Sequence, residues 1–133
     1  MKKILFLLSL TVIIFSVISC EKDPHIPPDI QFKTGPGYTS GDATVAKNTA
    51  VTVGIIATKT EDELRTYNIS YAYDNATTTT TAQTFTISKS EENRYEKDYT
   101  FSTRNQTGTE RWIFTVTDRD GNIAQKQIVL TIQ

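Results

Sequence analysis

The chain has few of the residues from which most catalytic and metal sites are built. Its 133 residues include one cysteine, Cys20, and one histidine, His25. A disulfide within one chain is therefore excluded. The residues after position 28 contain neither type, so they cannot form Cys–His or Ser–His–Asp arrangements, and zinc sites also prefer these ligands. We expect no enzymatic activity and no cofactor.

Long apolar runs are also scarce, and the run that is present lies at the N-terminus. Lys2 and Lys3 precede ILFLLSLTVIIFSVIS at residues 4–19, and a charged stretch follows directly. A membrane-spanning helix needs about 20 apolar residues. A positive start, a short apolar middle and a small exit residue are instead typical of a secretory signal peptide. We expect residues 1–19 to be that signal peptide.

The exit sequence VISC accounts for the position of the single cysteine. It resembles the lipobox of bacterial lipoproteins, which implies that the Cys20 thiol receives a diacylglyceryl group and that Cys20 becomes the mature N-terminus. Stable membrane anchoring needs more than one acyl chain, and a lipoprotein carries them on one residue. The alternative is cleavage elsewhere, with Cys20 as an incidental free thiol.

Residues 20–28 are expected to form the acylated cysteine and an extended spacer. The three prolines in EKDPHIPPD disfavour both a helix and a central strand, so the segment would hold a domain off the bilayer. We expect His25 in this spacer to be solvated rather than ligating. Glu21–Asp23 are similar to the surface-export signal of Bacteroidetes lipoproteins, which implies an outer-membrane location with the domain facing the cell surface.

Charge of one sign is not concentrated in the chain. The formal net charge is −1, and it becomes −3 if residues 1–19 are removed, because Lys2 and Lys3 are lost and no acidic residue is. Nucleic-acid binding needs clustered Lys and Arg. We therefore expect no nucleic-acid partner.

Residues 29–133 alternate apolar and polar side chains with a period of two. This alternation, and the abundance of Thr, Tyr, Val and Ile, is typical of half-buried strands separated by Gly-, Asn- and Asp-containing turns. We expect one all-β domain, an immunoglobulin-like antiparallel β-sandwich of about seven strands. The aligned residues that we expect on the core face are Val51, Val53, Ile55, Ala57, Tyr67, Ile69, Tyr71, Tyr73, Phe85, Ile87, Tyr95, Tyr99, Phe101, Trp112, Phe114, Val116, Ile128, Leu130 and Ile132.

Two segments depart from this alternation. TEDELRT at residues 60–66 could host a helical turn. The threonine run at residues 77–81 could be either a polar edge strand or a long loop.

The segment WIFTVTDRDGNIAQKQIVLTI, residues 112–132, resembles the last hairpin of bacterial immunoglobulin-like domains. With GPGYTSGDATV and VTVGIIATK, the chain is similar to small Bacteroidetes lipoproteins that carry one such domain. The resemblance implies a cell-envelope protein and carries almost no information about a ligand. The inter-sheet disulfide of antibody domains is missing, so packing around Trp112 and the tyrosines would have to replace it.

The turn DRDGN resembles a fragment of a calcium loop. Asp118, Asp120 and Asn122 are the candidate ligands, and Asp74 and Asn75 lie in another loop. Calcium takes six to eight oxygen ligands, so this fragment supplies too few alone. The favoured interpretation is a hairpin turn in which Asp and Gly satisfy the turn geometry.

The remaining candidate residues are carboxylates and tyrosines. A paired-carboxylate glycosidase would have to use Glu61, Asp62, Glu63, Glu91 or Glu92, which we expect in solvated loops. Tyrosines could form a glycan-stacking surface, but most lie at core positions. Tyr38, in the Gly-rich loop GPGYTSG, is the possible ligand contact.

These patterns predict a non-catalytic binding or scaffolding module, attached to the outer membrane through the lipid on Cys20. We expect it to serve as an accessory subunit of an envelope complex. The alternative is a surface module that binds glycan on its own.

Overall fold

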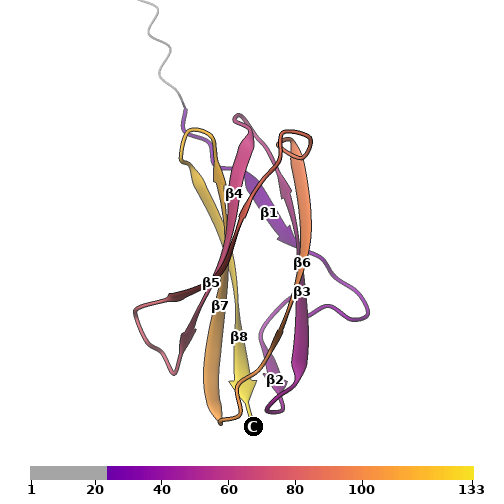
Figure 1. The fold of residues 1–133 in the computed structure, drawn as a ribbon, viewed down its shortest axis with the longest axis vertical. Helices are drawn as coiled ribbons and strands as arrows, with labels where there is room; N and C mark the ends of the chain where they lie inside the picture. The colour runs from indigo at the N-terminus through magenta and orange to yellow at the C-terminus, as the bar shows by residue number, and fades with distance from the viewer. Residues whose placement is uncertain (1–23) are drawn as a thin grey trace, which may run out of the picture.

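A computed structural model describes residues 24–133 of the chain, which contain eight β-strands (Figure 1). The strands are β1 (Asp29–Phe32), β2 (Ala43–Val45), β3 (Ala50–Thr58), β4 (Leu64–Tyr73), β5 (Thr80–Thr86), β6 (Arg94–Ser102), β7 (Gly108–Asp118) and β8 (Ile123–Ile132). The predicted signal peptide and the acylation of Cys20 lie outside the described residues. Within residues 24–133, no helix is long and apolar enough to cross a membrane.

The strands form two layers that face each other (Figure 1). The small sheet has the order β1-β3-β6, and the large sheet has the order β2-β8-β7-β4-β5. All neighbouring strands are antiparallel except β2 and β8, which run parallel. The expected immunoglobulin-like β-sandwich is therefore confirmed.

The structure has eight strands rather than about seven because the first strand is divided between the two sheets. β1 pairs with β3 of the small sheet, and β2 pairs with β8 of the large sheet. Between them, Gly35 and Gly37 have φ angles of 116° and 88°. Glycine adopts these values without strain, so residues 33–42 can leave one sheet and join the other.

Aromatic side chains connect the two sheets. Trp112 of the large sheet is 4% exposed and stacks on Phe101 of the small sheet, with 3.7 Å between ring centroids. Phe32 of the small sheet meets Phe114 of the large sheet edge-on at 5.6 Å. This packing confirms the predicted core role of Trp112. The buried cluster consists of Ile30, Val51, Val53, Ile55, Ala57, Leu64, Tyr67, Ile69, Ile87, Tyr95, Phe101, Trp112, Phe114, Val116, Ile128, Leu130 and Ile132.

The side chains on the predicted core face of β4 become more exposed towards the end of the strand. Tyr67 and Ile69 are fully buried, Tyr71 is half-buried and Tyr73 is 37% exposed. The guanidinium of Arg104 lies 4.7 Å from the ring centroid of Tyr73. Individual side chains such as Arg104 thus cover Tyr73, whereas a facing sheet covers the earlier residues.

The two segments without alternation resolve differently. Residues 60–66 contain no helical turn, so that expectation was wrong. The backbone N–H of Leu64 donates to the Glu92 carbonyl at 2.8 Å, and the Glu63 carbonyl accepts from the Arg119 N–H at 2.8 Å. Backbone groups that a helix would pair locally are used between loops instead. In the threonine run, residues 77–79 form a loop and Thr80 begins β5, so each interpretation holds for one part.

We expect Trp112→Ala to lower the free energy of unfolding by about 3–5 kcal/mol, the usual cost of removing a buried large aromatic side chain. The substitution opens a cavity against Phe101 and also removes the indole donor from Glu110. Urea unfolding followed by circular dichroism measures the loss. A loss below about 1 kcal/mol would contradict the core role of Trp112.

Candidate functional site

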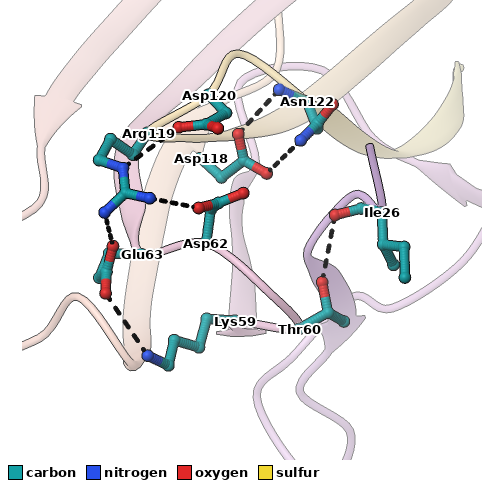
Figure 2. Close-up of polar contacts among 9 residues, drawn as sticks. All are labelled: Ile26, Lys59, Thr60, Asp62, Glu63, Asp118, Arg119, Asp120 and Asn122. Atoms are coloured by element: carbon teal, nitrogen blue, oxygen red, sulfur yellow. Dashed lines mark hydrogen bonds and ion pairs between the residues drawn. The ribbon is translucent and has the colours of Figure 1, made fainter. Parts of the chain in front are cut away.

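The chain enters the sandwich at one end, here called the N-terminal pole, which holds residues 24–28, 59–63, 87–93 and 119–122 (Figure 1). Pro28 is buried there. The Thr60 hydroxyl lies within hydrogen-bond distance of two spacer carbonyls. It is 3.3 Å from that of Ile26 (Figure 2) and 2.8 Å from that of Pro27. The last residues of the predicted spacer are therefore fastened to the domain rather than free of it.

The DRDGN turn at this pole closes on itself. Asp118 is 1% exposed, and its carboxylate accepts hydrogen bonds from the backbone N–H of Asn122 at 2.8 Å and from the Asn122 side-chain amide at 3.0 Å (Figure 2). Gly121 has a φ of 89°, as a tight turn requires. Asn122 thus points a donor, not an oxygen ligand, at Asp118. Within the described residues, no group of three or more His, Cys, Asp or Glu side chains is placed to hold a metal ion.

Arg119 gathers acidic side chains from two loops. Its guanidinium binds Asp62 and Glu63 of the β3–β4 loop, the latter at 2.7 Å, and Asp120 at 3.1 Å (Figure 2). Lys59 adds an ion pair to Glu63 at 3.6 Å. A hydrogen bond from its own backbone N–H, followed by the charge of Arg119, holds the pKa of Glu63 below its ordinary value. This Arg119 cluster ties the two loops together.

An open groove of about 520 Å³ lies beside the Arg119 cluster. Its lining includes two of the candidate carboxylates, Glu63 and Glu92, and the apolar residues Leu64 and Ile87. Glu91 is directed elsewhere, because its carboxylate accepts a hydrogen bond from Ser88 at 2.6 Å. Of the five candidate carboxylates, Asp62 and Glu63 thus bind Arg119, Glu63 and Glu92 line the groove, Glu91 is bonded to Ser88, and Glu61 is exposed.

Tyr38 lies over Gly54 on the outer face of the small sheet. Its hydroxyl donates to Asp98 at 2.9 Å, and Lys33 forms an ion pair with the same carboxylate at 2.9 Å. A Cβ on Gly54 would lie 2.8 Å from the Tyr38 ring and 2.7 Å from both Asp98 and Lys33. The missing side chain of Gly54 thus makes room for this cluster. The bond to Asp98 raises the pKa of Tyr38, while Lys33 lowers the pKa of Asp98.

The opposite end of the sandwich, here called the distal pole, is organised by Arg104. Its guanidinium binds both carboxylate oxygens of Asp74, one of them at 2.8 Å, and the Thr109 N–H adds a bond to Asp74 at 3.0 Å. Gly108 has a φ of 136°, and a Cβ there would lie 2.2 Å from Asp74 Oδ1 and 2.1 Å from Arg104 Nη2. Only glycine fits at this position without displacing the ion pair.

A buried carboxylate joins the distal pole to the core. Glu110 is fully buried, and its two oxygens accept hydrogen bonds from the Arg104 backbone N–H at 2.8 Å and from the Trp112 indole N–H at 2.9 Å. The sequence patterns did not single out Arg104, Gly108 or Glu110. A signal existed for Glu110, which stands in phase with the core residues Trp112 and Phe114. A charged residue at such a position needs internal partners.

No known family model and no characterised protein sequence matches the chain. A chitin-binding domain from Burkholderia pseudomallei is similar in structure, with a TM-score of 0.53 and 10% identity over 71% of this chain. The chain spans 58% of the length of that protein. A chain from the complex of zinc 2-glycoprotein and prolactin inducible protein from human seminal plasma gives a TM-score of 0.52 at 11% identity, covering 86% of this chain and 99% of that one. These likenesses establish the shared β-sandwich fold.

The Asp74–Arg104 ion pair makes stability depend on pH. The hydrogen bond from Arg104, followed by that from Thr109, lowers the pKa of Asp74 from 3.8 to about 2. Because the pKa is lower in the folded chain, the stabilisation is complete above about pH 5 and is lost as the pH falls towards 2. The free energy of unfolding, measured with a chemical denaturant between pH 6 and pH 2, should therefore fall less steeply with pH for Asp74→Asn than for the wild type. Equal slopes would contradict a native Asp74–Arg104 pair.

Gly108→Ala is expected to destabilise the domain more than Gly121→Ala, by at least about 1 kcal/mol. Both glycines have positive φ, but a Cβ at Gly121 meets nothing within 4 Å, whereas a Cβ at Gly108 would collide with Asp74 and Arg104. Gly121→Ala therefore controls for backbone strain alone. Urea unfolding of both variants gives the comparison, and equal losses would show that the distal pole tolerates displacement of the ion pair.

Proposed function

We propose that this protein is a non-catalytic binding module, held on the outer membrane of a bacterium by a lipid on Cys20 and serving as an accessory subunit of an envelope complex. The observation that carries the proposal is the fastening of Ile26 and Pro27 to Thr60. The residues that follow the proposed anchor are thereby held at the N-terminal pole. This supports an arrangement in which the distal pole and the strand edges face a partner.

The length of the tether limits where the domain can lie. The chain between Cys20 and Ile26 spans at most about 20 Å when fully extended. Because Ile26 is already held at the N-terminal pole, the sandwich would stand close to the membrane with that pole towards it. The charged residues Glu21–Asp23 favour the cell surface over the periplasm as the side that the domain faces.

The proposed lack of catalytic activity is supported by the ion pairing and ionisation of the acidic residues. Arg119 neutralises Asp62 and Glu63, and the lowered pKa of Glu63 keeps it ionised, which does not suit a general acid. Glu92 lines the same groove, and the other carboxylate in that lining is Glu63. A glycosidase mechanism needs one protonated and one ionised carboxyl group across a sugar.

A protein partner is favoured over a glycan by the placement of the aromatic rings. Glycan stacking needs exposed ring faces, and among the described residues Tyr73 is the one exposed large aromatic side chain. Its ring is already contacted by Arg104 at 4.7 Å and by Tyr71 at 4.9 Å between centroids. Tyr38 is bound to Asp98. The alternative, a glycan-binding module acting alone, finds support in the fold that the chain shares with a chitin-binding domain.

The anchor and the partner can be tested together in native envelopes. We expect the wild type to fractionate with the outer membrane, to carry acyl chains on Cys20 and to crosslink to one dominant protein. Cys20→Ala should lose the lipid, the membrane association and the partner. A matched control, Cys20→Ala combined with Ser16→Cys, keeps one thiol in the chain but should restore none of these.

Two results would contradict this proposal, each at a different point. Membrane association of Cys20→Ala at the wild-type level would contradict the lipid anchor. Correct anchoring of the wild type without any dominant crosslinked protein would contradict the accessory-subunit role, and would direct attention to binding of purified envelope polysaccharides.

A further inference from the structure

The two sheets end in four strands with a free edge: β1, β6, β2 and β5. β1 has four residues and β2 has three. β6 is longer but carries Arg94, Glu96, Lys97 and Asp98. Short length and charge are both devices that prevent an edge from pairing with another strand. The seven residues of β5, TTAQTFT, contain no charged residue and no proline.

The backbone groups of β5 that point away from the sheet can be identified. The Ile87 N–H donates to the Arg65 carbonyl at 2.9 Å, and Thr86 is paired with Thr66 in the register of β4. Hydrogen-bonded and non-hydrogen-bonded pairs alternate in an antiparallel ladder. Thr84 and Thr86 therefore direct their N–H and C=O groups to the free edge.

A bulge limits the usable part of this edge. The register of β4 with β5 shifts between Ile69 and Ser70, opposite Ala82, and is regular from Gln83 to Thr86. A bulge discourages pairing where it occurs. The regular part, Gln83–Thr86, remains as the β5 edge that is open to pairing.

We propose that the β5 edge at Gln83–Thr86 accepts an extended segment of a partner protein, which adds a strand to the large sheet. Main-chain hydrogen bonds to Thr84 and Thr86 would supply the affinity, and side chains alternating between the two faces would supply the specificity. The segment would lie beside Thr84 and Thr86 on the outer face, where uncharged residues fit.

The inner face of the β5 edge determines which side chains the partner segment can place on the core side of the large sheet. Phe85 is half-buried there, and Lys97 Nζ lies 4.8 Å from the centroid of its ring. Within residues 24–133, Lys97 forms no ion pair. A segment that alternates uncharged polar residues with apolar or acidic residues would therefore complement both faces of the β5 edge.

A second copy of this chain is a poorer occupant, and this step rests on the proposed lipid anchor. Two β5 strands related by a two-fold axis would run antiparallel, which turns one sandwich end over end relative to the other. Their N-terminal poles would then lie at opposite ends of the pair, and the tether between Cys20 and Ile26 reaches only about 20 Å. Both anchors could not enter one membrane.

The experiment uses the full chain in native envelopes, with the photo-crosslinking residue p-benzoylphenylalanine placed at Thr84 or at Thr86. The same probe at Thr44 of the short edge strand β2 is the control. We expect a crosslinked species from the β5 positions and at least about fivefold less from Thr44, because β2 is the opposite edge of the large sheet and the bound segment would not reach it. Mass spectrometry of the crosslinked peptides should map the two β5 positions to partner residues two apart.

Substitutions at Thr84 on the β5 edge provide an independent test of strand addition. Thr84→Pro removes the outward N–H and should reduce crosslinking from a probe at Thr86 at least about fivefold. Thr84→Lys keeps the internal ladder and adds an edge charge, so it should have the same effect if Thr84→Pro misfolds. Thr44→Lys should leave the yield unchanged.

Four results of the crosslinking experiment would overturn the inference. A crosslinked product of twice the chain mass would show a second copy of this chain as the partner, and equal yields from probes at Thr84 and Thr44 would show no preference for β5. The absence of any product from the β5 probes, or crosslinked partner residues that are not two apart, would show that no strand is added there. Membrane fractionation of the same samples separates this failure from a failure of the anchor. A chain without lipid on Cys20 would leave the membrane fraction whether or not the β5 edge crosslinks.

Discussion

The indole of Trp112 joins the two sheets to each other and the core to the distal pole. Its ring stacks on Phe101 of the small sheet at 3.7 Å, and its N–H donates to the buried Glu110 at 2.9 Å. Glu110 also binds the backbone N–H of Arg104, whose guanidinium holds Asp74. A buried carboxylate is tolerated only where donors satisfy it. The distal loops are thus fixed to the core by a chain of noncovalent contacts, in a domain that has no disulfide to do so.

The fold was predictable wherever the partner of a residue is another regular strand. Tyr67, Ile69 and Val116 alternate with polar neighbours, and each is buried in the core between the sheets, so period-two alternation was sufficient to place them. It was insufficient for Tyr73, which Arg104 covers, and for residues 60–66, which bind loops remote in sequence. Local patterns contain no information about such partners.

The candidate sites show the same division. Tyr38 stands in a glycine-rich loop, and nothing near it in the sequence indicates that Gly54 leaves space for its ring beside Asp98. Gly108 is likewise explained only by Asp74 and Arg104, which approach it through the fold. Glu110 is different, because its position in phase with the core residues of β7 was visible in the sequence. A charged residue at a core position is a usable signal for a buried polar network.

The surface of the sandwich has two kinds of region, one rich in ion pairs and one with uncharged polar contacts. Ion pairs join the loops at both poles and cover the small sheet around Lys33 and Asp98. The outer face of the large sheet instead carries polar contacts between uncharged side chains, such as Asn68 with Thr84 at 2.8 Å.

Removing water from hydroxyl and amide groups costs far less than removing it from ions, since these groups can exchange hydrogen bonds with an incoming strand. The face and edge at Thr84 therefore combine a lower desolvation cost than that of the ion-paired regions with main-chain groups that no strand pairs. If this domain binds a partner, those two properties favour the β5 edge over the more highly charged poles.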